Sequence, residues 1–219
     1  MNTSSTGLRL LSILVGTFLL AGCQGTGLTI NYEPRALSTH PTNTATVQNE
    51  ALKIDVEPFQ DARPQQHRLG SRTHFWGGAT HFNAWNGNVG EGMANLAVQY
   101  LKQQQWQASL SDTGTESQNT PSDVTLKGTV LALNANAKSG FGFTDITVDM
   151  RVRFEAENTV DGSTIRMVLG ANGSDSVIAF EPTDVDRLLN LVAKDLYKQL
   201  FQDLGVKNKA FHLRPGVGP

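Results

Sequence analysis

The 219-residue sequence contains only one cysteine, Cys23. A single thiol cannot form a disulfide within the chain, and it cannot supply the paired cysteines of the usual zinc sites. The sequence also lacks the G-x-S-x-G motif of serine hydrolases, the H-E-x-x-H motif of zinc proteases and a glycine-rich phosphate-binding loop. We therefore predict no catalytic, cofactor-binding or metal-binding residues and a protein that is not an enzyme.

An excess of charge of one sign is also missing. The chain has 18 lysines and arginines against 20 aspartates and glutamates. Proteins that bind nucleic acids normally carry a basic excess, so we expect no nucleic-acid partner. Apart from one apolar run near the N-terminus, no stretch approaches the roughly 18 residues that a membrane-spanning helix needs.

That apolar run extends from Leu10 to Leu20, follows one cation, Arg9, and ends in small residues. Its eleven residues would span roughly 17 Å as a helix, which is too short for a hydrocarbon layer of roughly 30 Å. The pattern is typical of a secretory signal peptide, which we assign to residues 1–22.

The run closes with Leu20-Ala21-Gly22-Cys23, which resembles the lipobox of bacterial lipoproteins. The resemblance implies that Cys23 becomes the first residue of the mature protein and carries a thioether-linked diacylglycerol and an N-acyl chain such as palmitate. It also implies an outer-membrane location on the periplasmic face, since Gln24 stands where enteric inner-membrane lipoproteins have Asp. The alternative is an ordinary signal peptide that contains a cysteine by chance.

Residues 24–50 consist mostly of Thr, Asn, Pro, Gly and Ala, with Leu28-Thr29-Ile30 as the only candidate strand. A flexible coil of this length has a root-mean-square span of about 30 Å. With Cys23, we expect residues 23–50 to form a lipidated tether that lets the folded part stand clear of the lipid. A single domain over 51–205 and a C-terminal tail over 206–219 complete the predicted organisation.

The strand signals show hydrophobic residues at every second position. They occur in residues 52–59, in 123–133, in 146–157 and in 163–171, and the third contains six alternations. Asp161-Gly162 lies between the last two and predicts a hairpin. Gly140-Phe141-Gly142-Phe143 is predicted to be a turn or a bend in a strand.

Two segments have helical periodicity. Asn88 with Glu91 forms a candidate capping box for a helix that precedes Trp106, although Gly90 and Gly92 weaken its first turn. A second apolar stripe follows Thr183, whose spacing from Asp186 offers another cap, and continues to Gly205. Together these elements predict an α+β fold in which two helices pack on one face of an antiparallel sheet of about four to six strands.

The order of these segments resembles that of YajG-like envelope lipoproteins. It resembles more loosely the auxiliary lipoproteins of ABC-type transporters and the amino-terminal domain type of TolB and CsgG. The resemblance covers roughly residues 50–204 and depends on the lipobox, the segment 59–63, Leu69-Gly70, the helix before Trp106, the strand from Asp123 and the last helix. It implies a sandwich of helices on a sheet without catalytic residues, with Phe59, Asp61 and Arg63 in a turn after the first strand.

Four large aromatic residues stand among glycines and asparagines in residues 74–87, namely Phe75, Trp76, Phe82 and Trp85. In an exposed loop they would form a candidate partner-binding patch, because Trp and other aromatic residues contribute strongly to interfaces. Alternatively, they fold into the core as an extra pair of strands. A lipid-contacting patch is less favoured, since no cations accompany the aromatic residues.

His67, His74 and His81 recur every seven residues and raise the hypothesis of a metal site. This spacing has no ligand geometry outside a helix, so we expect solvated histidines. Asp61 and Arg63 could act as an acid and a charge clamp, but local hydrogen bonds within a turn explain them better.

The sequence favours a non-enzymatic outer-membrane lipoprotein that binds or assembles cell-envelope partners. One alternative is the lipid-anchored auxiliary subunit of an ABC-type intermembrane transporter. A second, less favoured alternative is an anchored metal-dependent hydrolase that uses His67, His74, His81 and Asp61. A small-ligand site between helices and sheet remains open, and the sequence does not indicate the oligomeric state.

Overall fold

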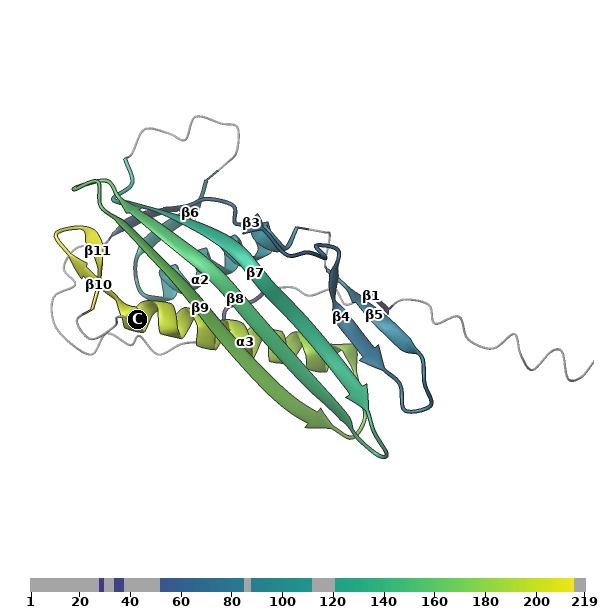
Figure 1. The fold of residues 1–219 in the computed structure, drawn as a ribbon. Coiled ribbons are helices and arrows are strands. Elements are labelled where there is room, and N and C mark those ends of the chain that lie inside the picture. The colour runs from purple at the N-terminus through teal and green to yellow at the C-terminus, as the bar shows by residue number, and fades with distance from the viewer. Residues whose placement is uncertain (1–27, 30–33, 38–51, 85–87, 112–120, 215–219) are drawn as a thin grey trace, which may run out of the picture.

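The computed structural model describes residues 28–29, 34–37, 52–84, 88–111 and 121–214 (Figure 1). The described elements are, in chain order, β1 Leu28–Thr29, β2 Lys53–Val56, β3 Gln60–Asp61, β4 Arg68–Thr73, β5 Ala79–Asn83, α2 Val89–Gln103, β6 Gln107–Leu110, β7 Val124–Ser139, β8 Thr144–Asn158, β9 Thr164–Val177, α3 Pro182–Asp203, β10 Leu204–Lys207 and β11 Ala210–Leu213.

Three long strands, β7, β8 and β9, form an antiparallel meander. Every apolar residue of the six alternations in β8, from Ile146 to Ala156, is buried, while the residues between them are exposed or half-buried. Asp161-Gly162 lies in the turn between β8 and β9 and confirms the predicted hairpin. The Gly140–Phe143 segment is the turn between β7 and β8, as predicted.

The opposite edge of β7 pairs with three short strands that follow one another along it. β2 pairs with Val124–Leu126, β3 with Thr129–Val130 and β4 with Ala135–Lys138, all in parallel. β6 extends the sheet beyond β2, and β5 and β1 extend it beyond β4. Nine of the described strands therefore share one mixed sheet, so the sheet has more strands than the four to six predicted and is not antiparallel throughout. The reason is that α2 carries the chain back across the sheet, so β6 joins β2 in parallel.

Both helices cover the same face of this sheet, and the α+β class is confirmed (Figure 1). The ring of Tyr100 in α2 stacks on that of Tyr197 in α3, with the centroids 4.9 Å apart. Tyr197 in turn contacts Phe154 of β8, whose ring meets the edge of Phe59. These rings join the two helices and the sheet in a single hydrophobic core.

The start of α2 confirms the predicted cap, because the Asn88 side chain accepts a hydrogen bond from the Glu91 backbone N–H at 3.1 Å. The cap predicted for the last helix is wrong. Glu181, not Thr183, is the N-cap, and it forms a capping box with Asp184. Pro182 at the first helical position fixes this start, since proline suits the first turn of a helix.

Gly90 lies in the first turn of α2, directly against the backbone after β2. A Cβ atom at this position would lie 1.9 Å from the carbonyl oxygen of Phe59. The helix begins at Val89, so the glycines do not delay its start. Gly90 allows the helix to approach the sheet closely, which its low helix propensity did not indicate.

The sequence predicts a flexible tether before residue 51, whereas the structure attaches two of its segments to the folded domain. β1 pairs with β5. The backbone N–H groups of Arg35, Ala36 and Leu37 donate to Asn190, Gln99 and Tyr100, respectively, at 2.9 to 3.2 Å. We call residues 34–37 the leader segment, and it lies against both helices.

The residues after α3 also differ from the predicted tail. β10 and β11 form an antiparallel hairpin that continues directly from the helix. The buried side chain of Asn158 accepts a hydrogen bond from the Phe211 N–H at 2.8 Å and donates one to the Phe211 carbonyl at 2.9 Å. The Phe211 ring packs against Trp106. The folded domain therefore continues beyond residue 205 and includes this hairpin.

Burial raises the pKa of Tyr100 to about 12. Below pH 10 the phenol is neutral in both the folded and the unfolded chain. Between about pH 10 and 12 the unfolded chain ionises first, so the free energy of unfolding should fall as the pH rises through this range. Chemical denaturation at several pH values should show this fall, and the Tyr100→Phe variant should show a smaller one. Equal pH dependence in both proteins would contradict the prediction.

Candidate functional site

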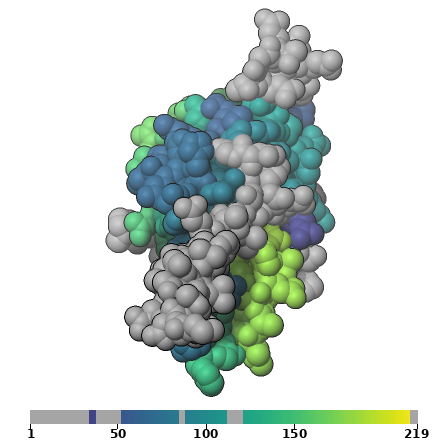
Figure 2. All heavy atoms as spheres, turned by 90° about the vertical axis from the view of Figure 1, so that its right-hand side faces the viewer, coloured from purple at the N-terminus to yellow at the C-terminus, as the bar shows by residue number. Residues whose placement is uncertain are grey.

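Two hairpin ends meet at one end of the sheet. The turn between β4 and β5 spans His74 to Gly78, and it is closed by hydrogen bonds between the backbones of His74, Gly77 and Gly78. Because β4 and β7 run in parallel with Thr73 opposite Lys138, the turn between β7 and β8 lies at the same end. In Figure 2 the green β7–β8 turn lies at the lower end of the view, with part of the blue β4–β5 hairpin just above it.

These two turns, together with the residue after β9, expose five large apolar side chains that we call the aromatic tip. Its members and their exposed fractions are Phe75 47%, Trp76 93%, Phe141 86%, Phe143 45% and Ile178 90%. The ring centroid of Phe75 lies 4.8 Å from that of Trp76 and 6.3 Å from that of Phe141. Exposed apolar clusters of this kind mark surfaces that contact another molecule or a membrane.

The aromatic tip differs from the patch predicted from the sequence. Phe75 and Trp76 are exposed, but Phe82 is fully buried and stacks on Phe180, so it does not belong to the patch. Trp85 lies outside the described residues. The segment thus combines both sequence interpretations, because it forms a strand pair whose strand β5 enters the core while its turn remains exposed. Phe141, Phe143 and Ile178 were not predicted as members of this patch, although the two phenylalanines in a glycine-containing turn were a usable signal.

Arg63 and Asp61 form a buried ion pair at the end of β3. Nε and Nη2 of Arg63 donate to the two carboxylate oxygens of Asp61 at 2.9 and 2.8 Å. The remaining N–H groups donate to the backbone carbonyls of Gln66, Arg68 and Leu133 at 2.7 to 3.3 Å. All five donors of the guanidinium are therefore used within the fold.

This geometry gives Arg63 and Asp61 a structural role. The Arg63 side chain is 4% exposed and the Asp61 side chain 13% exposed. The Phe59 ring, two residues before Asp61, covers Gly128 of β7, where a Cβ atom would lie 2.4 Å from Cδ2 of the ring. The segment 59–63 thus joins β2, β3 and β4 to the long strand β7.

The three histidines with seven-residue spacing lie just before β4, just after β4 and in β5. The His74 ring Nε2 lies 2.7 Å from Thr80 Oγ1, and His67 and His81 are exposed. Within the described parts of the chain, no group of three or more His, Cys, Asp or Glu side chains could hold a metal ion. The structure therefore does not assemble the residues of the metal-dependent hydrolase hypothesis into one site.

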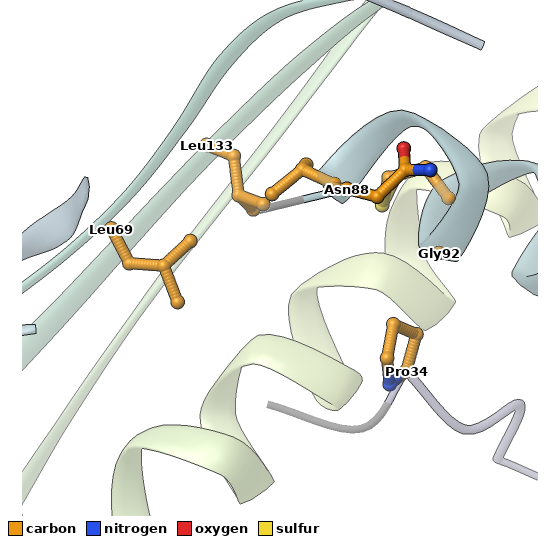
Figure 3. Close-up of a pocket in the computed structure, with 7 residues that line it drawn as sticks. Pro34, Leu69, Asn88, Gly92 and Leu133 are labelled. Carbon is orange, nitrogen blue, oxygen red and sulfur yellow. The ribbon is translucent and has the colours of Figure 1, made fainter. Parts of the chain in front are cut away.

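A small pocket lies between α2 and the sheet (Figure 3). It is lined by Pro34, Leu69, Asn88, Val89, Gly92, Met93 and Leu133. Its free volume is about 10 Å³, which is room for about one water molecule. Pro34 belongs to the leader segment, so this segment forms part of the pocket wall. The pocket is far smaller than the roughly 300 Å³ of a typical small-molecule site.

The outer face of the sheet is polar. A shallow depression of about 290 Å³ crosses β7, β8 and β9, and it is lined mainly by Asn134, Asn136, Thr147, Asp149, Asn172 and Ser174. These side chains are exposed because they alternate with the buried residues beneath the helices.

Across the described ranges, none of the helices has the length and apolar content that crossing a membrane would require.

No protein-family model and no curated protein match the chain. Among solved structures, it is similar to protein XCC0632 from Xanthomonas campestris, which is assigned to the family DUF330. The two share 9% identity with a TM-score of 0.50, over 80% of this chain and 92% of the other. A further similar structure is lipoprotein GNA1162 from Neisseria meningitidis, with 12% identity and a TM-score of 0.37 over 68% of this chain and 97% of the other.

At such low identity, the likeness to XCC0632 concerns the fold alone. Membership of the YajG-like family stays a prediction.

Proposed function

We propose that this protein is a non-enzymatic lipoprotein of the bacterial outer membrane, which faces the periplasm and binds cell-envelope partners. The observation that carries the proposal is the position of the single cysteine at the end of Leu20-Ala21-Gly22-Cys23, directly after the apolar run. Acyl chains on Cys23 would contribute about 0.8 kcal/mol for each buried methylene, so three chains would anchor the protein stably.

The geometry of the ion pair supports a binding protein rather than an enzyme. Arg63 and Asp61, which from the sequence could act as a charge clamp and an acid, satisfy each other, and Arg63 also donates to three backbone carbonyls. The aromatic tip and the polar outer face of the sheet offer surfaces for contact with other molecules.

Metabolic labelling with radioactive palmitate tests the anchor. The wild-type protein should incorporate the label and sediment with the outer membrane, and the Cys23→Ser variant should do neither. The matched variant Gln24→Asp should keep the label but move to the inner membrane, where enteric sorting retains lipoproteins with Asp at this position. Absence of label from the wild-type protein, or a mature N-terminus other than Cys23, would overturn the proposal.

Crosslinking in intact cells, followed by purification of the labelled lipoprotein, tests the partner. Recovery of a specific envelope protein would support the proposed binding function. Recovery of the subunits of an ABC-type transporter would instead favour the auxiliary-subunit alternative. Recovery of no specific partner would count against both.

A further inference from the structure

We propose that the aromatic tip inserts into the surface of the bilayer that carries the acylated Cys23. This inference rests on the proposed lipid anchor and adds a second contact between protein and membrane. It follows from the direction of β1, from the length of chain before β1 and from the side chains at the tip.

The direction is set by the pairing of β1. β5 begins at Ala79, next to the turn that holds Phe75 and Trp76, and runs away from that turn. β1 pairs with β5 in parallel, with Leu28 opposite Phe82. β1 therefore runs away from the aromatic tip, as β5 does, and its first residue, Leu28, is the end of β1 nearer the tip.

The length of chain before β1 keeps this end of the sheet near the membrane. Five peptide units separate Cys23 from Leu28, so Leu28 lies within about 17 Å of an acylated Cys23 even when the chain is fully extended. Phe82 is the third residue after Ala79, which is a distance of about 10 Å along a strand. The turn with Trp76 thus projects toward the bilayer by at least about 10 Å from the level of Leu28, whereas the chain from Cys23 to Leu28 spans at most about 17 Å.

The chemistry of the tip suits a lipid surface. Trp is enriched at membrane interfaces, and Phe and Ile partition into the acyl region. Behind the tip, Lys138 lies opposite Asp145 in the β7–β8 hairpin, and the Arg72 guanidinium lies over the Phe180 ring. Lipid contact was the less favoured interpretation of the sequence, because no cations accompany the aromatic residues of segment 74–87. A covalent anchor removes that objection, since it supplies the high local concentration that allows a weak apolar contact to form.

In the experiment that tests this inference, a hexahistidine tag bound to a nickel-chelating lipid replaces the acyl anchor, so the result does not depend on lipidation of Cys23. Residues 23–219 with Cys23→Ser retain every described residue and contain no cysteine. A hexahistidine tag before residue 23 binds this protein to vesicles of phosphatidylethanolamine and phosphatidylglycerol that contain a nickel-chelating lipid. The fluorophore NBD, which brightens in apolar surroundings, is attached to a single new cysteine in place of Trp76, of Phe141 or of Val160. Val160 is 60% exposed in the turn at the opposite end of the meander and serves as the matched control.

We expect NBD at positions 76 and 141 to brighten several-fold on vesicles and to be quenched by lipids brominated in the acyl chain. NBD at position 160 should not change. Adding Trp76→Asp to the protein labelled at position 141 should abolish the response there, because a carboxylate does not enter the acyl region.

Unchanged fluorescence at positions 76 and 141, or an equal response at position 160, would overturn the inference. Brightening without vesicles, together with dimers in sedimentation velocity, would also overturn it, because the tip would then contact a second copy of the chain. Palmitate labelling of Cys23 decides the anchor separately, so failure of the tip and failure of the proposed function can be distinguished.

Discussion

Replacing Arg63 by alanine is expected to lower the free energy of unfolding by about 3 to 5 kcal/mol, the range for removing one partner of a buried ion pair. The substitution leaves the nearly buried Asp61 carboxylate without its counter-ion, and it leaves the carbonyls of Gln66, Arg68 and Leu133 without a donor. For a domain of this size the melting temperature should fall by about 10 °C. Thermal unfolding followed by circular dichroism measures this change.

Arg166→Ala is the matched control. Arg166 also forms a bidentate pair, with Glu155 at 2.8 and 3.0 Å, but its side chain is 68% exposed. An exposed pair contributes about 0 to 1 kcal/mol, so the melting temperature should change little. Arg63→Lys should behave more like Arg63→Ala, because one ammonium cannot replace five planar donors. If Arg63→Ala and Arg166→Ala both changed the melting temperature only slightly, the structural role of Arg63 would be contradicted.

Gly90→Ala is expected to destabilise the protein by about 3 kcal/mol, at the upper end of the cost of overpacking a core. Helix propensity alone predicts the opposite sign, a gain of about 1 kcal/mol when glycine becomes alanine within a helix. The close contact decides the outcome, since the new Cβ would lie 1.9 Å from the Phe59 carbonyl oxygen, and this oxygen belongs to backbone, which cannot move aside as a flexible side chain can. Urea denaturation should show a lower midpoint with an unchanged slope.

Gly170→Ala in β9 provides the same substitution at an open position. The nearest atom to a Cβ there is the Met150 carbonyl oxygen at 3.5 Å, which is an ordinary contact. Its free energy of unfolding should stay within about 1 kcal/mol of the wild-type value. If Gly90→Ala proved as stable as the wild type, α2 would not lie against the Phe59 backbone as closely as the structure indicates.

The parts of the fold that follow from local pattern were predicted well. The alternation in β8 predicted a long half-buried strand, Asp161-Gly162 predicted a hairpin, and Asn88 with Glu91 predicted the start of α2. Each signal depends on residues within a few positions of one another, so each can be recognised without knowledge of the rest of the chain.

The parallel pairs could not be predicted in this way. β2 meets β7 about 70 residues later in the chain, and the Leu28–Thr29 backbone meets that of Phe82 and Asn83. Nothing in the sequence of either partner specifies the other, because backbone hydrogen bonds carry no side-chain identity. The prediction therefore did not include the pairing of β2, β3 and β4 with one edge of β7. It also treated the leader segment as part of a tether.

The candidate site was likewise predicted only in part from the sequence. The sequence identified Phe75 and Trp76 as unusual, but it could not show that Phe82 turns inward or that Phe141 lies beside Phe75. Those facts depend on the parallel pairing of β4 with β7, which aligns the ends of two hairpins.

The sequence by itself determined the single cysteine behind an apolar run, the periodicity of the long strands and helices, and the near balance of charge. These are properties of composition and of short spacing. Only the tertiary structure decided which aromatic side chains remain exposed, that Arg63 is fully satisfied by its surroundings, and that β1 runs away from the aromatic tip. The physical reason is that burial, buried ion pairing and strand direction are set by contacts between residues far apart in the chain.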